Sequence, residues 1–198
     1  KMTHEYFPLE LGDYEIVLIN SKVHHSLAAG EYNLRRKQCE QGLMLMGTDG
    51  AISSFRDIKK WENLLSFRER MSEEVFMRCL FVVQEIARTQ KAANCLQQNN
   101  LVELGKLMNQ THEGLSKLYQ VSCSELDFLQ ERALQNKNVL GARMMGGGFG
   151  GCTINLVKKD TVSSLIENVT LAYEKKFGLL AEAYIVETAD GVNKIVSH

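Results

Sequence analysis

The glycine run between positions 146 and 151 constrains the fold of this chain more than any other stretch. Five of those six positions are glycine (Gly146, Gly147, Gly148, Gly150 and Gly151), and only Phe149 interrupts them. Glycine has no Cβ, so such a run can adopt positive φ angles and let backbone N–H groups approach another group closely. Two interpretations stay open from the pattern alone: a structural turn, or a loop whose amides face an anion such as phosphate.

The segments beside the run narrow its class. Residues 139–145 and 152–157 have the composition of strands, and in the second Cys152, Ile154 and Leu156 alternate with Thr153 and Asn155. The run therefore joins two strands. The spacing Gly146-x-Gly148-x-x-Gly151 matches a dinucleotide fingerprint, but that motif needs a helix after it, and a Walker A loop needs a lysine that is missing here. A protein-kinase loop is excluded because the catalytic motifs of that fold are missing.

Composition excludes several classes of partner. The 198 residues carry a formal net charge of −1 and are 44% hydrophobic, which suits a globular domain and gives no basic field for nucleic acid. We expect no membrane partner and a cytoplasmic location, because no apolar run is long enough to span a bilayer and the first residues lack a signal core. The five cysteines are odd in number and widely spaced, which indicates reduced thiols.

Periodicity predicts a mixed chain with strands mainly towards its ends. Strands are expected at 15–20, 139–145, 152–157 and 181–188, and helices at 30–46, 72–99, 100–118, 124–133 and 160–177. Ser72 and the pairs Asn100/Glu103 and Ser124/Asp127 mark helix starts. A short helix with Trp61, Leu64, Leu65 and Phe67 along one side is expected within the less periodic stretch 48–70.

A second polar stretch, residues 20–40, links the first strand to the first helix, a place where α/β proteins often bind ligands. Composition alone favours a solvated loop followed by a charged helix face, with Tyr32 packed at the start of the helix. The pair His24 and His25 lacks a third ligand at a suitable spacing for a metal. His112 is interpreted as a hydrogen-bonded structural histidine.

Two segments together resemble a known family. They are Asn20-Ser21-x-Val23-x-His25-Ser26-Leu27-Ala28-x-x-Glu31-Tyr32-Asn33-x-Arg35-Arg36-x-Gln38-Cys39-Glu40 and Gly141-Ala142-Arg143-Met144-Met145-Gly146-Gly147-Gly148-Phe149-Gly150-Gly151-Cys152-Thr153. They resemble two signatures of the galactokinases, which belong to the GHMP family of small-molecule kinases. Shorter matches around His112, Val121 to Asp127 and Ala189 to Gly191 extend the resemblance over essentially the whole chain.

The resemblance implies a fold and an activity. The expected fold is an α/β chain of the α+β type, with residues 1–198 forming the GHMP-kinase C-terminal domain: a small antiparallel sheet packed with helices. The implied reaction moves the γ-phosphoryl group of ATP to the anomeric hydroxyl of galactose with the help of Mg²⁺. No segment resembles the family's first sugar-binding motif, its phosphate loop or its catalytic aspartate, so we expect an N-terminal lobe of the same protein to carry them. The chain alone is expected to be inactive.

The resemblance also assigns site residues. The loop Gly146, Gly147, Gly148, Phe149, Gly150 and Gly151 would border the place where phosphate meets sugar, and Tyr32 aligns with a tyrosine that contacts the sugar. His24 and Ser26 would lie near the nucleotide. No catalytic residue and no metal ligand is expected in this chain, so ATP and Mg²⁺ would be bound mainly by the other lobe.

Two alternative functions use the same scaffold. One is a kinase for N-acetylgalactosamine, since Tyr32 alone does not fix the sugar. The other is a sensor that binds galactose and ATP without catalysis, which a non-acidic residue in place of the family's aspartate would favour.

Overall fold

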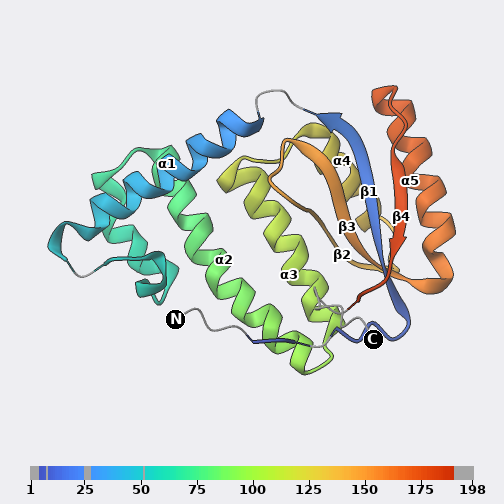
Figure 1. The fold of residues 1–198 in the computed structure, drawn as a ribbon, viewed down its shortest axis with the longest axis horizontal. Helices are drawn as coiled ribbons and strands as arrows, with labels where there is room; N and C mark the ends of the chain where they lie inside the picture. The colour runs from blue at the N-terminus through green and yellow to red at the C-terminus, as the bar shows by residue number, and fades with distance from the viewer. Residues whose placement is uncertain (1–4, 8, 25–27, 51, 190–198) are drawn as a thin grey trace, which may run out of the picture.

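The computed structural model describes residues 5–7, 9–24, 28–50 and 52–189 of the chain. These residues contain four strands and five α-helices, which are joined by short 3-10 segments and one π-helical segment, η4 (Figure 1). In chain order the elements are β1 (Tyr14–His24), α1 (Ala28–Met46), η1 (Gly47–Asp49), η2 (Phe55–Asp57), η3 (Trp61–Arg70), α2 (Glu73–Gln97), α3 (Leu101–Glu113), η4 (Gly114–Tyr119), α4 (Ser124–Leu134), β2 (Val139–Met144), β3 (Gly150–Lys158), η5 (Lys159–Thr161), α5 (Val162–Phe177) and β4 (Glu182–Val186).

The four strands form one antiparallel sheet in the order β2-β3-β1-β4. The strand predicted at 15–20 is confirmed as part of β1, which continues to His24. Because β1 pairs with both β3 and β4, it lies in the interior of the sheet. Val17 lies opposite Asn155, and Ile19 lies opposite Thr153. The glycine run joins β2 to β3, as its flanking segments predict.

One face of the sheet is covered by α4 and α5, whose apolar side chains form the main core with the strands. Its buried members are Val17, Ile19, Leu129, Ala133, Val139, Ala142, Val157, Val162, Leu165, Val169 and Tyr173. Thr153 and Asn155 are fully buried, whereas Cys152 and Ile154 are only half-buried. Asn155 keeps its buried side chain bonded by donating from Nδ2 to the Val17 carbonyl at 2.9 Å. The alternation of apolar and polar residues in β3 therefore does not show which side chains are more deeply buried, because the polar Thr153 and Asn155 are buried more than Cys152 and Ile154.

Helix α3 packs along β2, the edge strand on one side of the sheet (Figure 1). Two of its side chains accept hydrogen bonds from N–H groups of β2: Asn109 Oδ1 from Ala142 at 2.8 Å and His112 Nδ1 from Met144 at 3.0 Å. A Cβ on Gly105 would lie 2.3 Å from the Leu140 carbonyl oxygen, so glycine permits this close approach. The helix thus occupies backbone donors that an edge strand would otherwise expose.

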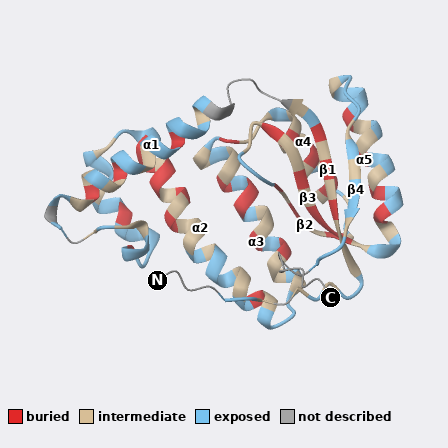
Figure 2. Ribbon diagram, in the orientation of Figure 1, coloured by how far each residue is buried: buried red, intermediate tan, exposed pale blue. Residues whose placement is uncertain are grey.

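A second apolar cluster lies away from the sheet, between α1, α2 and the 3-10 segments (Figure 2). Its buried members are Met46, Ile58, Leu64, Val75, Phe76, Cys79 and Val83. The short helix expected here is the 3-10 segment η3, in which Leu64 is buried and Phe67 half-buried, whereas Trp61 and Leu65 are exposed. The prediction that all four share one covered side is wrong for Trp61 and Leu65, whereas Leu64 and Phe67 share it at the three-residue repeat of a 3-10 helix.

The predicted helix starts divide into two kinds. Ser72 and Asn100 cap α2 and α3, accepting hydrogen bonds from the N–H groups of Val75 and Glu103. Helix α4 begins at Ser124 as predicted, but its N-cap is Cys123 and no side chain caps it. The carboxylate of Asp127 is bonded elsewhere, as described below.

Candidate functional site: the glycine loop and its supports

The loop between β2 and β3 has the backbone that its glycines predict. Gly146, Gly148, Gly150 and Gly151 have φ angles of 83°, 88°, 127° and 83°, and the one side chain within the run, Phe149, also has a positive φ of 58°. The Met145 N–H donates to the Cys152 carbonyl at 3.0 Å and closes the base of the loop. Positive φ angles at four glycines explain why other residues would be strained here.

The second half of the loop is pressed against two other segments. The Phe149 N–H donates to the Val121 carbonyl at 2.7 Å, and a Cβ on Gly148 would lie 2.1 Å from that same oxygen. A Cβ on Gly150 would lie 2.2 Å from the Val23 carbonyl oxygen near the end of β1. Gly148 and Gly150 are therefore required by close backbone approach as well as by φ.

The first half of the loop is open. A Cβ on Gly146 or Gly147 would meet nothing within 4 Å, and both residues are exposed. Among the hydrogen bonds of the described residues, none uses the N–H of Gly146, Gly147 or Gly148. Three consecutive amides are thus available to an anion, the arrangement that the phosphate-facing interpretation requires.

A small apolar cluster supports the loop from below. Val121, Leu126 and Met144 are buried and pack with the half-buried Phe149. Ser21, in β1, donates from Oγ to the Gly151 carbonyl at 2.8 Å and also accepts from the Tyr173 hydroxyl through its backbone carbonyl at 2.9 Å. The loop is therefore fixed to the sheet and, through Tyr173, to α5.

Arg35 connects α1 to the loop, although sequence reasoning places it on a solvated, charged helix face. That interpretation is wrong, because Arg35 is only 7% exposed. Its guanidinium donates to the carbonyls of Tyr119 and Gln120, both at 2.9 Å, and forms an ion pair with Glu31 at 3.0 Å. Its Cζ also lies 5.8 Å from the centre of the Phe149 ring, within cation–π range.

Arg78, from α2, is fully buried and bonds to residues 118 and 120, next to the groups that Arg35 contacts. The sequence pattern does not indicate this contact. Arg78 donates to the Leu118 carbonyl and, at 2.6 Å, to the side-chain oxygen of Gln120. These groups end η4, a π-helical segment, and cations are favourable where helix carbonyls are left without partners. Arg35 and Arg78 together fix the chain that leads to Val121.

His112 is the structural histidine that the sequence predicts, and it lies beneath the start of the loop. Its Nδ1 accepts a hydrogen bond from the Met144 N–H, so in the neutral ring the proton is on Nε2. Nε2 lies 3.1 Å from Asp127 Oδ1, but the geometry is not that of a hydrogen bond, so the contact is mainly an electrostatic attraction to the carboxylate. Asp127 also accepts from Ser122 at 2.5 Å and from Ser116 at 2.9 Å. Partial burial would raise the pKa of Asp127, but these bonds outweigh it and hold that pKa below its ordinary value.

Of the remaining predicted site residues, Tyr32 is fully described, His24 only by its backbone, and Ser26 not at all. Tyr32 is 53% exposed, so the packed position that composition favours is not observed, and its hydroxyl makes no hydrogen bond with described residues. It precedes Arg35 by three positions in α1, which puts both on one side of the helix. The backbone of His24 pairs with Gly150, next to the loop, but its side chain is outside the described part, and Ser26 lies wholly outside it.

The described residues contain no group of three or more His, Cys, Asp or Glu side chains that could hold a metal ion. No helix in that part combines the length and apolar character that a bilayer-spanning segment needs. The cysteines in it are free, with Cys79 and Cys95 buried and the other three half-buried.

Comparison with known proteins shows which proteins this chain is similar to. Residues 92–175 match the family model described as GHMP kinases C terminal. Galactokinase from Thermotoga petrophila is 40% identical over 98% of this chain and 53% of that protein, and galactokinase from Levilactobacillus brevis is 42% identical over 96% and 49%. The chain thus spans about half the length of the curated relatives it matches.

Solved structures give the same result. Lactococcus lactis galactokinase, crystallised with galactose, matches 95% of this chain and 48% of its own with a TM-score of 0.89 at 35% identity. Leishmania major mevalonate kinase shares the fold alone, with a TM-score of 0.57 at 18% identity. The chain belongs to the GHMP kinase family, as a C-terminal domain of the kind found in galactokinases.

Proposed function

We propose that this chain is the C-terminal lobe of an enzyme that transfers the γ-phosphoryl group of ATP to the anomeric hydroxyl of galactose, in the cytoplasm. The observation that carries the proposal is the match to galactokinases over 98% of the chain, which includes the glycine loop and its supports. Because the chain spans 53% of that relative, the activity belongs to a protein that also contains an N-terminal lobe. The chain alone is proposed to be inactive.

Phosphoryl transfer depends mainly on positioning and charge stabilisation, and the loop can supply part of both. The unused N–H groups of Gly146, Gly147 and Gly148 can face phosphoryl oxygens at low entropic cost, because the loop is already ordered by Val121 and Arg35. The exposed hydroxyl and ring of Tyr32 are available to the sugar. His24 and Ser26 remain proposed neighbours of the nucleotide.

Mg²⁺ prefers carboxylate oxygens and substrate phosphates, and the described residues offer no cluster of acidic side chains for it. The metal ion, the catalytic acid and most ATP contacts belong in our proposal to the N-terminal lobe.

The test is a coupled assay of ADP formation with the full-length protein that contains this chain. Galactose should support turnover and N-acetylgalactosamine should not, and the 198-residue chain assayed alone should give no turnover. Turnover with N-acetylgalactosamine alone would identify the other sugar kinase. Galactose and ATP binding without ADP formation would identify a sensor, and either result would refute the proposal.

A further inference from the structure

A cavity of about 340 Å³ lies between α2, α3 and the face of the sheet opposite α5. Its walls are largely aliphatic, with Leu96, Leu104, Met108, Ile16, Ile154 and Leu11 among the lining residues. The glycine loop does not line it. A mainly apolar cavity of this size with a few convergent polar groups is the usual form of a small-molecule site.

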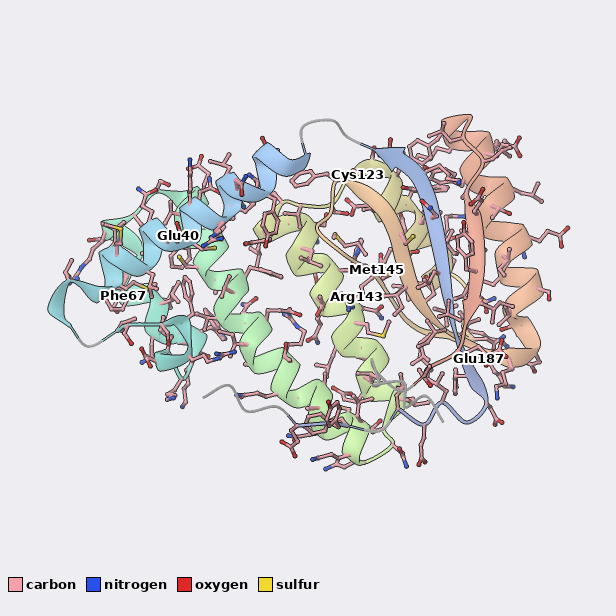
Figure 3. The ribbon with its side chains drawn as sticks, in the orientation of Figure 1. Glu40, Phe67, Cys123, Arg143, Met145 and Glu187 are labelled. Carbon is pink, nitrogen blue, oxygen red and sulfur yellow. The ribbon has the colours of Figure 1, made fainter. Side chains whose placement is uncertain are left out.

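One end of the cavity is polar, and Arg143 is its distinctive member. Figure 3 labels Arg143, which comes from β2 beside α3. Its guanidinium has five N–H donors, but its hydrogen bonding to described residues consists of one bond, from NH1 to the Met144 carbonyl at 3.2 Å. Burial lowers the pKa of Arg143, and nearby Glu85 only partly offsets this. Arg143 is half-buried, and a cation taken partly out of water without an ion-pair partner is costly.

The neighbouring acid does not supply that partner. Glu85 forms an ion pair with Arg88 and accepts a hydrogen bond from Thr111 Oγ1 at 2.9 Å, and all three residues line the cavity. No ion pair joins Arg143 to any described carboxylate. Glu85 and Arg88 cancel, so among the described residues the polar end keeps one positive charge without an anionic partner, and this charge faces an apolar space.

We propose that this cavity binds a small amphipathic monocarboxylate, with the carboxylate on Arg143 and an unbranched apolar tail along the aliphatic walls. The planar guanidinium fork matches a carboxylate, and one negative charge balances the one unpaired cation. A space of this volume holds roughly ten water-sized groups, about the number of non-hydrogen atoms in an eight-carbon acid. The site is independent of the phosphoryl-transfer function proposed above.

Binding of octanoate to the full-length protein, measured by isothermal titration calorimetry, tests the proposal without any assay of turnover. Octanamide has the same shape and no charge, and butyrate has the same charge and a shorter tail. We expect octanoate to bind at least about tenfold more tightly than either, since a charge-assisted hydrogen bond and buried methylenes each contribute on that scale. Equal affinity for octanoate and octanamide, or no binding of octanoate at about 5 mM, overturns the proposal.

Two variants locate the site. Arg143→Gln should weaken octanoate about tenfold or more, whereas Arg36→Gln, which removes an exposed arginine outside the cavity, should not change it. If Arg143→Gln does not fold, Met108→Trp gives the same test, because the larger side chain fills the cavity and should abolish binding. Unchanged affinity in a folded cavity variant would refute the site.

Discussion

The two halves of the glycine loop share a composition but differ in environment. Gly146 and Gly147 face open space and have free amides, whereas Gly148 and Gly150 lie against the carbonyl oxygens of Val121 and Val23. The first half is thus available to a ligand, and the second half holds the loop in place. A glycine-rich sequence can therefore contain two different requirements for glycine, one for access and one for close packing.

The largest expected effect comes from adding a methyl group to the packed half. Gly148→Ala places a Cβ where it would meet the Val121 carbonyl and keeps a φ of 88° that alanine disfavours. We expect a loss on the order of 3 kcal/mol in the free energy of unfolding, measured by denaturant titration.

Gly147→Ala is the matched control from the open half, where φ is ordinary and space is free. It should change stability by no more than about 0.5 kcal/mol, yet lower the turnover of the full-length enzyme. Equal stability losses in the two variants would remove the distinction between the halves.

A smaller but still large effect is expected at the support of the packed half. Arg35→Ala removes two hydrogen bonds to the carbonyls of Tyr119 and Gln120 and the contact with Phe149, so we expect a loss of about 2 kcal/mol. Arg36→Ala deletes the adjacent arginine, whose side chain is 72% exposed, and should cost less than about 0.5 kcal/mol. Thermal or chemical unfolding of both variants measures the difference, and similar losses would show that Arg35 is not a specific support.

Asp127 should give the packed half a pH dependence. Because its pKa is lowered in the folded protein, its contribution is complete above the ordinary value of about 3.9 and is lost as pH falls through the lower folded value. Asp127→Asn should cost about 1 kcal/mol at pH 7, a modest figure because the side chain is partly exposed, and the difference from the parent should shrink in acid. A cost that stays constant down to pH 2 would show that the charge has no part in it.

The smallest effect on stability is expected at Tyr32 in α1, the proposed sugar contact. Tyr32→Ala removes an exposed side chain that makes no hydrogen bond with the described residues, so the free energy of unfolding should change by less than about 0.5 kcal/mol. The KM for galactose should rise about tenfold while the KM for ATP stays unchanged. Tyr184→Ala, at an exposed tyrosine on β4, is the control, and an unaltered galactose KM in Tyr32→Ala would end the proposed sugar contact.

Much of the fold could be predicted from the sequence because it depends on local signals. The strand composition on both sides of the glycine run, the capping side chains of Ser72 and Asn100 and the position of Gly47 after α1 each determine an element boundary directly. The family resemblance supplied the small antiparallel sheet packed with helices, but neither it nor periodicity specified which helices cover which face.

The supports of the site could not be predicted in the same way. Arg35 and Arg78 look like surface residues by type, and they are buried because η4 ends with carbonyl groups that need donors. Asp127 resembles a helix-capping acid, but its partners are His112 and two serines before the helix. These roles depend on a π-helical turn and on long-range contacts, neither of which has a sequence period.

The hydrogen bond from the Phe149 N–H to the Val121 carbonyl also has a consequence for folding and for local opening of the native state. It can form only after α4, the turn before it and the sheet have all docked, because it joins segments that are distant in the chain. Its amide proton should therefore exchange with solvent only when the whole domain opens, while those of Gly146 and Gly147 exchange at nearly the rate of an unstructured peptide. One short loop would then contain amides whose hydrogen-exchange rates lie at the two extremes of the native state, only a few residues apart.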